Sequence, residues 1–413
     1  MTFGAPRQTR ILVSLSQSPP MRPGPSECTR NPFRLSNIIF KTITLGLHLD
    51  NSACKSVSKS DILKKTSKSF AMQAIRVGSA PSSAAPYSPS NPAPSSALYL
   101  DQNTPIPKPS KRDELLVRVK ATTVIRDMLT WPESYHQEHS IIGSDVSGIV
   151  AEVGSEDCKF RPGDEIFGML NVNRASAWAE YCIVEENEVA LKPKTLSWEQ
   201  AAAIPLSAQT AYEALFDHAS VPVPSVEEVA RSRSSRTSGE GQPRLLITGA
   251  AGAVGVYLVQ LASLAGLHVV AATSSNTRNA EFLRELGAHE TVEYGMLESH
   301  NSAYDIIIDT VGGGVLAKCW NYVKENGTLL SVDSASYNFV EDHEKRGIRR
   351  EGVRALFFIV GGSSKALHYL AELADSGFVR PFVAGTYPFA KVQEAYDIAN
   401  GRYPGRGKIV LTI

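Results

Sequence analysis

The chain has 413 residues, 43% of them hydrophobic and 20% charged, which is enough for two globular domains and a tail. Its 42 basic and 42 acidic side chains give a formal net charge of zero, which excludes the basic field of a nucleic-acid-binding protein. No apolar run approaches the ~20 residues of a membrane-spanning helix, so no contact with a membrane is expected.

The cysteines are scattered, and no two have the C-x-x-C spacing of a structural zinc site or a redox pair. We therefore expect free thiols in a reducing compartment. The positions are Cys28, Cys54, Cys158, Cys182 and Cys319.

Residues 1–71 differ in composition from the rest, being rich in Ser, Arg and Lys with only Glu27, Asp50 and Asp61 as acids. This is typical of a mitochondrial transit peptide. The alternative is that the natural chain starts at Met72, where a first strand begins. We exclude the leader from the fold and expect it to be poorly ordered. The expected location is cytoplasmic or mitochondrial.

A β-rich unit follows. Alternating apolar side chains at 72–77, 114–124, 141–154 and 179–184 predict strands, and a Pro/Ser-rich stretch at 80–96 separates the first two. Helical periodicity then begins at 197–219, with Ser197 as a candidate N-cap. The next stretch, residues 221–241, is polar and poor in aromatic side chains, which favours a surface insertion.

From residue 244 onward, short apolar runs alternate with amphipathic segments. This order predicts a doubly wound α/β domain, in which helices cover both faces of a parallel sheet. Strands are expected at 244–250, 268–273, 304–312 and 327–333, and helices at 253–266 and 278–288.

The turn after the first of these strands has the composition of a nucleotide-binding loop. Gly249 is followed by Ala-Ala-Gly-Ala-Val-Gly, residues 250–255, which lead directly into a helix. Small residues such as Gly252 and Ala253 let the backbone approach a pyrophosphate, and free N–H groups and the helix dipole meet its charge. Gly255 allows close packing of helix and strand. The alternative is a glycine-rich turn without a ligand.

The second strand of this domain ends in Ser-Ser-Asn-Thr-Arg, residues 274–278. An enzyme that selects NAD places an acidic residue there, to bind the ribose 2′-hydroxyl. Hydroxyls and a guanidinium suit a 2′-phosphate instead, which favours NADPH. Alternatively, Arg278 is a solvated residue at the start of a helix.

Taken together, the chain from Met72 to Ile413 resembles the medium-chain dehydrogenase/reductase superfamily, and most of all its zinc-independent quinone oxidoreductase and enoyl reductase branch. The matching pieces are residues 143–168, 201–215, 250–255, 309–313 and 405–413. The resemblance implies a GroES-like β-rich substrate domain (72–204), a Rossmann NADPH-binding domain (205–362), and a C-terminal return to the substrate domain (363–413).

The resemblance also implies the cofactor site. Thr210 would lie near the nicotinamide, and the backbone of Ala253 and Val254 would meet the pyrophosphate. Three side chains would surround the 2′-phosphate, and four further residues would line the rest of the cofactor path. The first group is Ser275, Arg278 and Tyr294, and the second is Gly312, Phe358, Ile359 and Lys408.

No metal is expected. By the resemblance, the places of the three catalytic zinc ligands are taken by Val124, Ser144 and Leu206. Val and Leu carry no donor atom, and none of the three offers the thiolate or imidazole that zinc prefers. Without such a Lewis acid, an alkoxide from an unactivated alcohol is poorly stabilised. Reduction of an acceptor that is already electron-poor needs less help.

Enone reduction also needs a proton donor, and the resemblance places Tyr135 there. The alternative is that Tyr135 stacks on the wall of the site. The family's usual Asn-Pro before Asp127 is absent, since Val124, Ile125 and Arg126 stand there. The contacts that select the substrate therefore differ from the family pattern.

The sequence thus predicts an NADPH-dependent reductase of a quinone or a conjugated enone, including an enoyl group bound to a carrier in a biosynthetic pathway. Two alternatives remain open: a catalytically idle relative that binds NADPH as a partner or sensor, and an alcohol dehydrogenase with displaced metal ligands. A homodimer formed through the edge of the Rossmann sheet near residues 355–360 is expected from the family.

Overall fold

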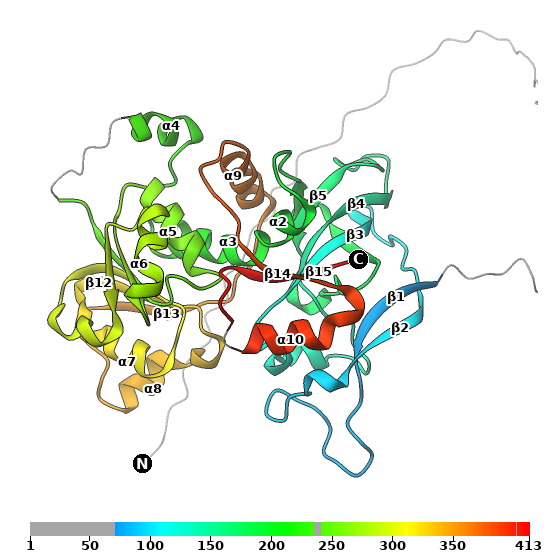
Figure 1. Cartoon of the computed structure of the whole chain (residues 1–413), viewed down its shortest axis with the longest axis horizontal. Coiled ribbons are helices and arrows are strands. Elements are labelled where there is room, and N and C mark those ends of the chain that lie inside the picture. The colour runs from blue at the N-terminus through cyan, green and yellow to red at the C-terminus, as the bar shows by residue number, and fades with distance from the viewer. Residues whose placement is uncertain (1–70, 235–240, 402) are drawn as a thin grey trace, which may run out of the picture. The chain divides into compact units, whose positions relative to one another are not determined.

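The computed structural model describes residues 71–413 except 235–240 and 402. The transit-like leader, residues 1–70, lies outside the described residues. The described part contains two large β-sheets and a two-stranded sheet, and Figure 1 labels strands of each. None of the helices in this part of the chain is both long and apolar enough to cross a bilayer.

The first large sheet contains the strands predicted early in the chain and closes with the last strand. Its order is β14-β15-β3-β4-β5-β7, and β6 also pairs with β3. All of its pairs are antiparallel except that of β14 and β15. The bounds are β3 Glu114–Val124, β4 Asp145–Val153, β5 Glu165–Met169, β6 Tyr181–Glu185, β7 Val189–Leu191, β14 Val383–Pro388 and β15 Lys408–Thr412.

A two-stranded sheet adjoins this unit. β1 (Ala71–Val77) pairs antiparallel with β2 (Leu98–Pro105), and the Pro/Ser-rich segment forms the connection between them. The sequence did not predict β2, because its stretch LYLDQNTP alternates poorly and ends in polar residues. The strand is held instead by its pairing with β1.

The second large sheet is parallel throughout, with the order β10-β9-β8-β11-β12-β13. Its strands alternate with helices, so the predicted GroES-like and Rossmann-type α/β fold class is confirmed. The strands are β8 Arg244–Ile247, β9 His268–Thr273, β10 Glu290–Glu293, β11 Tyr304–Asp309, β12 Val323–Ser331 and β13 Arg354–Phe357. The helices are α5 Gly255–Leu264, α6 Asn276–Glu285, α7 Gly313–Tyr322 and α8 Phe339–Lys345.

A helical segment joins the two sheets. Helix α2 (Trp198–Ala202) begins with the expected capping box, in which Ser197 and Gln200 bond each other's backbone N–H. Helix α3 (Pro205–Tyr212) is buried along its whole length and runs directly into a π-helical turn, Glu213–His218. Such turns are rare and are often found at functional sites.

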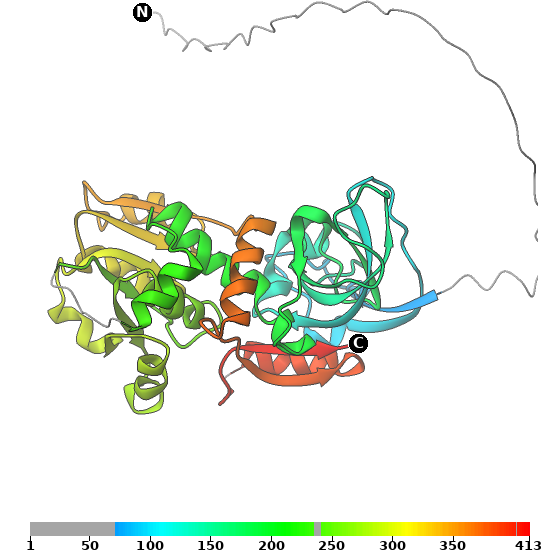
Figure 2. The ribbon, with the colours of Figure 1, turned by 90° about the horizontal axis from the view of Figure 1, so that it is seen from above.

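The C-terminal helices divide between the two sheets. Helix α9 (Ser364–Asp375) packs into the same hydrophobic cluster as α3 and α5, and both views show it between the sheets (Figures 1 and 2). Helix α10 (Val392–Asn400) packs on β14 and β15. The domain boundaries stay a prediction, but the packing places the chain's return to the first sheet at β14.

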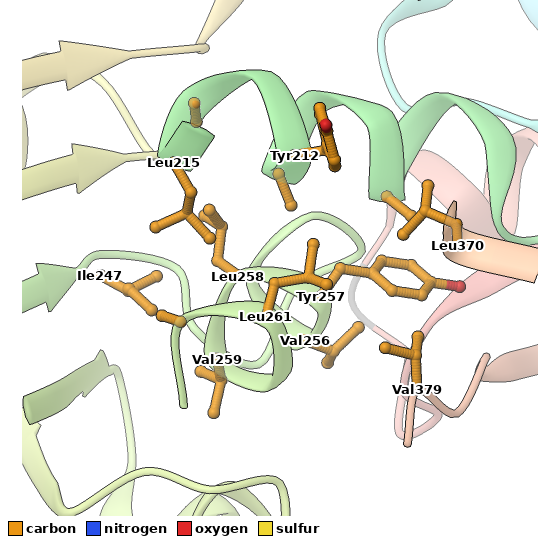
Figure 3. Packing of buried hydrophobic residues seen from close by; sticks show 14 of the residues in the cluster. Tyr212, Leu215, Ile247, Val256, Tyr257, Leu258, Val259, Leu261, Leu370 and Val379 are labelled. Carbon is orange, nitrogen blue, oxygen red and sulfur yellow. The ribbon is translucent and has the colours of Figure 1, made fainter. Parts of the chain in front are cut away.

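The largest hydrophobic cluster joins α3, α5, α9 and the strand β8. Figure 3 shows Tyr257 of α5 extending its ring between Leu370 and Val379. Its hydroxyl donates to Ala203 O at 3.1 Å, so the buried phenol keeps a partner. The nucleotide-side helix α5 is thereby fixed to the end of α2.

The insertion was expected to lie on the surface, but part of it is buried. It forms α4 (Val226–Ser234), in which Val229 is fully covered, and Tyr369 of α9 donates a hydrogen bond to Pro224 O at 2.7 Å. One apolar side chain among charged ones was too weak a pattern to predict this contact. Residues 235–240 of the insertion lie outside the described part.

One buried histidine makes stability depend on pH. His343 Nδ1 accepts a hydrogen bond from Trp320 Nε1 at 2.8 Å, and burial lowers the pKa of this imidazole. Below the unfolded pKa of ~6.5, the unfolded chain binds a proton that the folded chain resists. The free energy of unfolding should therefore fall as pH drops from about 7 to 5.5. His343→Gln keeps an acceptor without titrating, so its free energy of unfolding should fall less over this range in urea titrations. Equal losses would contradict this assignment.

Candidate functional site

The glycine-rich turn after β8 has the geometry of a nucleotide-binding loop. Gly249 has a φ of +67°, and a Cβ on Gly255 would lie 2.2 Å from Gly249 O. No larger residue fits at Gly255 because helix α5 starts so close to the strand. The backbone N–H groups of Ala253 and Val254 donate to none of the described residues. These residues therefore suit a pyrophosphate, with Gly252 exposed beside them.

The end of β9 and the end of β10 meet beside this turn. Tyr294 accepts a hydrogen bond from Gly249 N at 2.9 Å, and burial raises the pKa of its phenol. Ser275 precedes α6 without capping it, and Arg278 is exposed on its first turn. The structure thus brings the predicted 2′-phosphate residues to one edge of the sheet.

An acidic side chain lies in the same place and was missed by the sequence analysis. Glu293 Oε1 accepts a hydrogen bond from Asn276 N at 2.7 Å, which satisfies one free N–H at the start of α6. Its position at the end of β10, one residue before Tyr294, is the only sequence signal. Arg406 approaches from the C-terminal loop and donates to Arg278 O at 2.6 Å.

A buried carboxylate organises the ends of β8, β11 and β12. Asp309 accepts from Thr248 Oγ1 at 2.6 Å, from Gly312 N at 2.9 Å and from Ser331 Oγ at 3.1 Å. Burial raises the pKa of this carboxyl, against the effect of these bonds. Gly312 has a φ of +72°, and a Cβ there would collide with Asp333. Its place is therefore set by the loop, and its contact with a cofactor stays a prediction.

The residue predicted near the nicotinamide and two of those predicted along the rest of the cofactor path come from α3 and from the segment after β13. Thr210 is buried on α3 and donates to Leu206 O at 2.7 Å. Phe358 follows β13 and packs against the ring of His218, with 4.2 Å between ring centroids. Ile359 is 65% exposed. These placements leave an apolar side chain uncovered directly after the parallel sheet, where ligands of such sheets bind.

The loop that follows is held by two side chains that the sequence analysis did not single out. Glu213 accepts from Gly361 N at 3.0 Å and from Gly362 N at 2.7 Å, and Gln209 Oε1 accepts from Ser363 N at 2.7 Å. Gln209 and Glu213 lie four residues apart, so they share one helix face. They fix the backbone just after Phe358 and Ile359.

Lys408 forms a buried ion pair. Its Nζ lies 2.5 Å from Asp145 Oδ2, with side-chain exposures of 4% and 0%. Asp145 Oδ1 also accepts from Leu206 N at 2.7 Å, and Oδ2 accepts from Thr123 Oγ1 at 2.5 Å. The Lys408 ammonium is therefore committed to Asp145, and a direct contact with a cofactor stays a prediction.

The three zinc-ligand places adjoin this ion pair through direct contacts. Val124 pairs with Ile409, Ser144 directly precedes Asp145, and Leu206 N donates to Asp145 Oδ1. Among the described residues, no group of three or more His, Cys, Asp or Glu side chains could hold a metal ion. The cysteines of this part, Cys158, Cys182 and Cys319, are buried and free. The side chains at the three places thus do not fit a catalytic zinc ion.

Tyr135 is held by the backbone. Its hydroxyl donates to Leu129 O at 2.5 Å and accepts from Ala93 N at 2.9 Å, and burial raises the pKa of the phenol. It thereby ties the Pro/Ser-rich connection to the loop after β3. The role of Tyr135 as proton donor stays a prediction, and it would require these two bonds to open. A backbone contact of this kind leaves no signal in sequence spacing.

The loop after β3 encloses a cavity of about 420 Å³ with the segment after β5. Ser144 and Gly143 lie in its lining, as do Trp131 and Asn173. Tyr135 is absent from this lining and borders a separate hollow of about 460 Å³ beside the Pro/Ser-rich connection. The cavity at Ser144 is the candidate substrate site of the first domain.

Residues 111–194 match the alcohol dehydrogenase GroES-like domain, and residues 286–411 match the zinc-binding dehydrogenase family. The chain is 32% identical over 330 residues to a probable mitochondrial zinc-binding oxidoreductase of Arthroderma benhamiae, covering 78% of this chain and 94% of that one.

Two further relatives carry more specific names. The chain is 28% identical over 330 residues to the chloroplastic NADPH-dependent alkenal/one oxidoreductase of Arabidopsis thaliana, covering 76% of this chain and 75% of that one. Its structure is similar to that of the quinone oxidoreductase from Coxiella burnetii, with a TM-score of 0.67, 25% identity, and coverage of 83% and 99%.

Loss of the buried cation should destabilise the protein strongly. Lys408→Met leaves the Asp145 carboxylate buried without its counter-charge, which costs ~3–5 kcal/mol. The free energy of unfolding in urea checks this. Lys391→Met is a matched control, because its ion pair with Glu394 is exposed and contributes at most ~1 kcal/mol. A loss at Lys408 no larger than at Lys391 would contradict the buried pair.

Proposed function

We propose, from the premise that this chain belongs to the medium-chain dehydrogenase/reductase superfamily, that it is a zinc-independent, NADPH-dependent reductase of quinones or α,β-unsaturated carbonyls. A nicotinamide-dependent oxidoreductase role is common to its relatives. One observation carries the finer proposal: a nucleotide-binding turn occurs in a chain whose zinc-ligand places are Val124, Ser144 and Leu206.

The names of two relatives support the acceptor class, since one is an NADPH-dependent alkenal/one oxidoreductase and the other a quinone oxidoreductase. Both acceptors have a carbon made electron-poor by conjugation with a carbonyl. Such a carbon accepts a hydride without a metal ion to polarise the oxygen. Quinones and enones are therefore the acceptors that suit a site with Val124, Ser144 and Leu206 at the places of the zinc ligands.

Bound NADPH would supply the hydride. The chain's own contribution is to bind, orient and exclude water. The free N–H groups of Ala253 and Val254 would bind the pyrophosphate, and Phe358 and Ile359 would line a further part of the cofactor path. Glu213 and Gln209 keep the following loop in place.

The proposal retains Tyr135 as a candidate for protonating the α-carbon. Its two backbone bonds and its raised pKa make it a weak acid in the described conformation. Solvent is the other proton source. A carbanion adjacent to a carbonyl takes a proton readily once the hydride has been added, so the reaction does not depend on a strong acid.

NADPH selection is proposed to depend on Arg278 and Tyr294. Both lie at the edge where β9 and β10 end, and the guanidinium is exposed. Glu293 opposes them, because its carboxylate at the start of α6 repels a phosphate dianion. The preference for NADPH over NADH therefore depends on how far the attraction of Arg278 for the 2′-phosphate exceeds the repulsion by Glu293.

We also propose that the chain is mitochondrial and forms a homodimer. The basic leader and the mitochondrial name of a relative support the location. Among the strands that the structure describes, β13 pairs only with β12, which supports the dimer because an unpaired strand edge can pair with its copy. Import of the full chain into isolated mitochondria and light scattering check these two proposals.

The reductase proposal is tested by NADPH consumption at 340 nm with a series of acceptors. We expect turnover with 1,4-naphthoquinone and 3-hexen-2-one and none with hexanol and NADP⁺. Binding of NADPH without turnover of any quinone or enone would instead favour a cofactor-binding partner or sensor. Alcohol oxidation together with stoichiometric zinc in the purified protein would favour a dehydrogenase with displaced ligands.

Cofactor selection is tested by a pair of substitutions with opposite effects. Arg278→Ala removes a charge-assisted contact worth ~1.5–3 kcal/mol, so the NADPH affinity should fall at least tenfold. Glu293→Gln keeps an acceptor for Asn276 N but removes the negative charge, and NADPH binding should tighten about two- to fivefold. Fluorescence titration measures both, with the NADH affinity as control. An unchanged ratio of the two affinities in Arg278→Ala would contradict the assignment.

A further inference from the structure

The cavity at Ser144 contains an unusual polar group. Ser144 is 2% exposed and lines the cavity, and its hydroxyl makes no hydrogen bond to any of the described residues. The hydroxyl is not among the fully covered atoms without a partner, so it is accessible from the cavity. Its backbone is satisfied, because Ser144 O accepts from Leu170 N at 2.8 Å. Serine hydroxyls in the interior usually bond to other protein groups, so one that is free and faces a cavity is available to a ligand.

Other buried serines of this domain follow the usual rule. Ser134 Oγ donates to Met128 O at 2.7 Å, and Ser147 Oγ donates to Trp198 O at 2.7 Å. Ser147 lies only three residues after Ser144 and is also buried. The free hydroxyl of Ser144 is therefore a local exception, which points to a partner supplied by a ligand.

A second polar group of the lining lacks a partner. Trp131 Nε1 is buried and bonds to none of the described residues. An indole N–H only donates, and a serine hydroxyl can donate. The Trp131 N–H is covered in the described conformation, so Ser144 is the group that a ligand can reach. A ligand that meets its hydroxyl brings an acceptor oxygen, and a carbonyl group is the simplest such ligand.

The lining leaves no unpaired guanidinium for an anion, and its other basic groups are the imidazoles of His136 and His139. Arg76 is paired with Asp101 at 2.8 Å, and Arg174 is paired with Glu188 at 2.6 Å, so neither guanidinium is left over. Glu133 also lies in the lining and makes no ion pair with the described residues. A carboxylate or phosphate on the ligand would face this negative charge without a cation of its own.

The position of Ser144 connects the cavity to the proposed cofactor site. The next residue is Asp145, whose carboxylate binds Leu206 N at the start of α3. Thr210, one turn later, is the residue predicted to lie near the nicotinamide, and its hydroxyl returns to Leu206 O. Ser144 is thus joined to α3 through its neighbour Asp145.

We infer that this cavity binds the carbonyl end of an uncharged quinone or enone, and that the Ser144 hydroxyl donates a hydrogen bond to the carbonyl oxygen. This inference rests on the proposed function and narrows its substrate class. It favours free, neutral acceptors over acids and over groups that bring phosphate into the cavity.

The bond from Ser144 strengthens during reduction. Bound NADPH would supply a hydride to the β-carbon of an enone and become NADP⁺. The C=C π pair would then form a double bond between the α-carbon and the carbonyl carbon, and the C=O π pair would move to the oxygen to give an enolate. A solvent or side-chain proton then adds to the α-carbon. The developing oxyanion is a stronger acceptor than the carbonyl, so the donor at Ser144 favours the transition state.

Ligand binding without turnover is the first test. 2-Hexanone is a neutral carbonyl that this reaction cannot reduce, and it should change the fluorescence of Trp131 on titration into the full chain. Trp131→Phe should abolish the response and so show that the cavity is being observed. Hexanoate, an anion of the same length, should bind at least tenfold more weakly. Equal binding of hexanoate would overturn the neutral-ligand assignment.

Removal of the hydroxyl is the second test. Ser144→Ala should lower kcat with 3-hexen-2-one about ten- to a hundredfold. It should also lower the affinity for 2-hexanone several-fold and leave the affinity for NADPH unchanged. Because the Ser144 hydroxyl bonds to no other residue, the melting temperature of Ser144→Ala should equal or exceed that of the wild-type protein. Ser147→Ala is the matched control: it breaks the bond to Trp198 O, so it should lower the melting temperature and leave kcat within about twofold.

The two proposals fail in different ways. If the protein turns over no quinone or enone but 2-hexanone still binds and depends on Ser144, the reductase proposal fails and the carbonyl site stands. If turnover occurs but Ser144→Ala retains full kcat, or destabilises the protein as Ser147→Ala does, the Ser144 assignment fails and the reductase proposal stands.

Discussion

The Asp145 carboxylate is the constraint on which the rest of the structure depends. It is fully buried and accepts hydrogen bonds from Lys408, from Leu206 N and from Thr123. These partners belong to the last strand, to the helix that enters the second domain, and to the central strand of the first sheet. A buried charge cannot be left unpaired, so one side chain fixes the positions of three elements that are far apart in sequence.

Elements with a strong local pattern could be predicted from the sequence, and elements held by distant contacts could not. Alternating apolar residues predicted β3 and β4, and the Gly249 to Gly255 turn predicted the start of α5, because their periodicity and small side chains are local properties. Strand β2 and the buried contact of α4 depend on partners elsewhere in the chain. Their own residues carry too little apolar pattern to predict them.

The same distinction holds within the candidate site. The residues around the nucleotide-binding turn follow a spacing that resemblance to a family can transfer. The carboxylates of Glu213 and Glu293 instead act through bonds to backbone N–H groups of other segments, and backbone partners leave no trace in a sequence. Tyr135 shows this most clearly: its position in the chain predicted a proton donor, while its hydroxyl binds two backbone groups.

The position of β15 in the chain affects the order in which the two large sheets can form during synthesis. This strand lies inside the first sheet between β14 and β3, and it brings Lys408. A chain emerging from the ribosome therefore exposes β3 and β4 before this neighbour is made, while β8 to β13 of the second sheet are made earlier and can already pair. The first sheet is thus begun before the second sheet and completed after it.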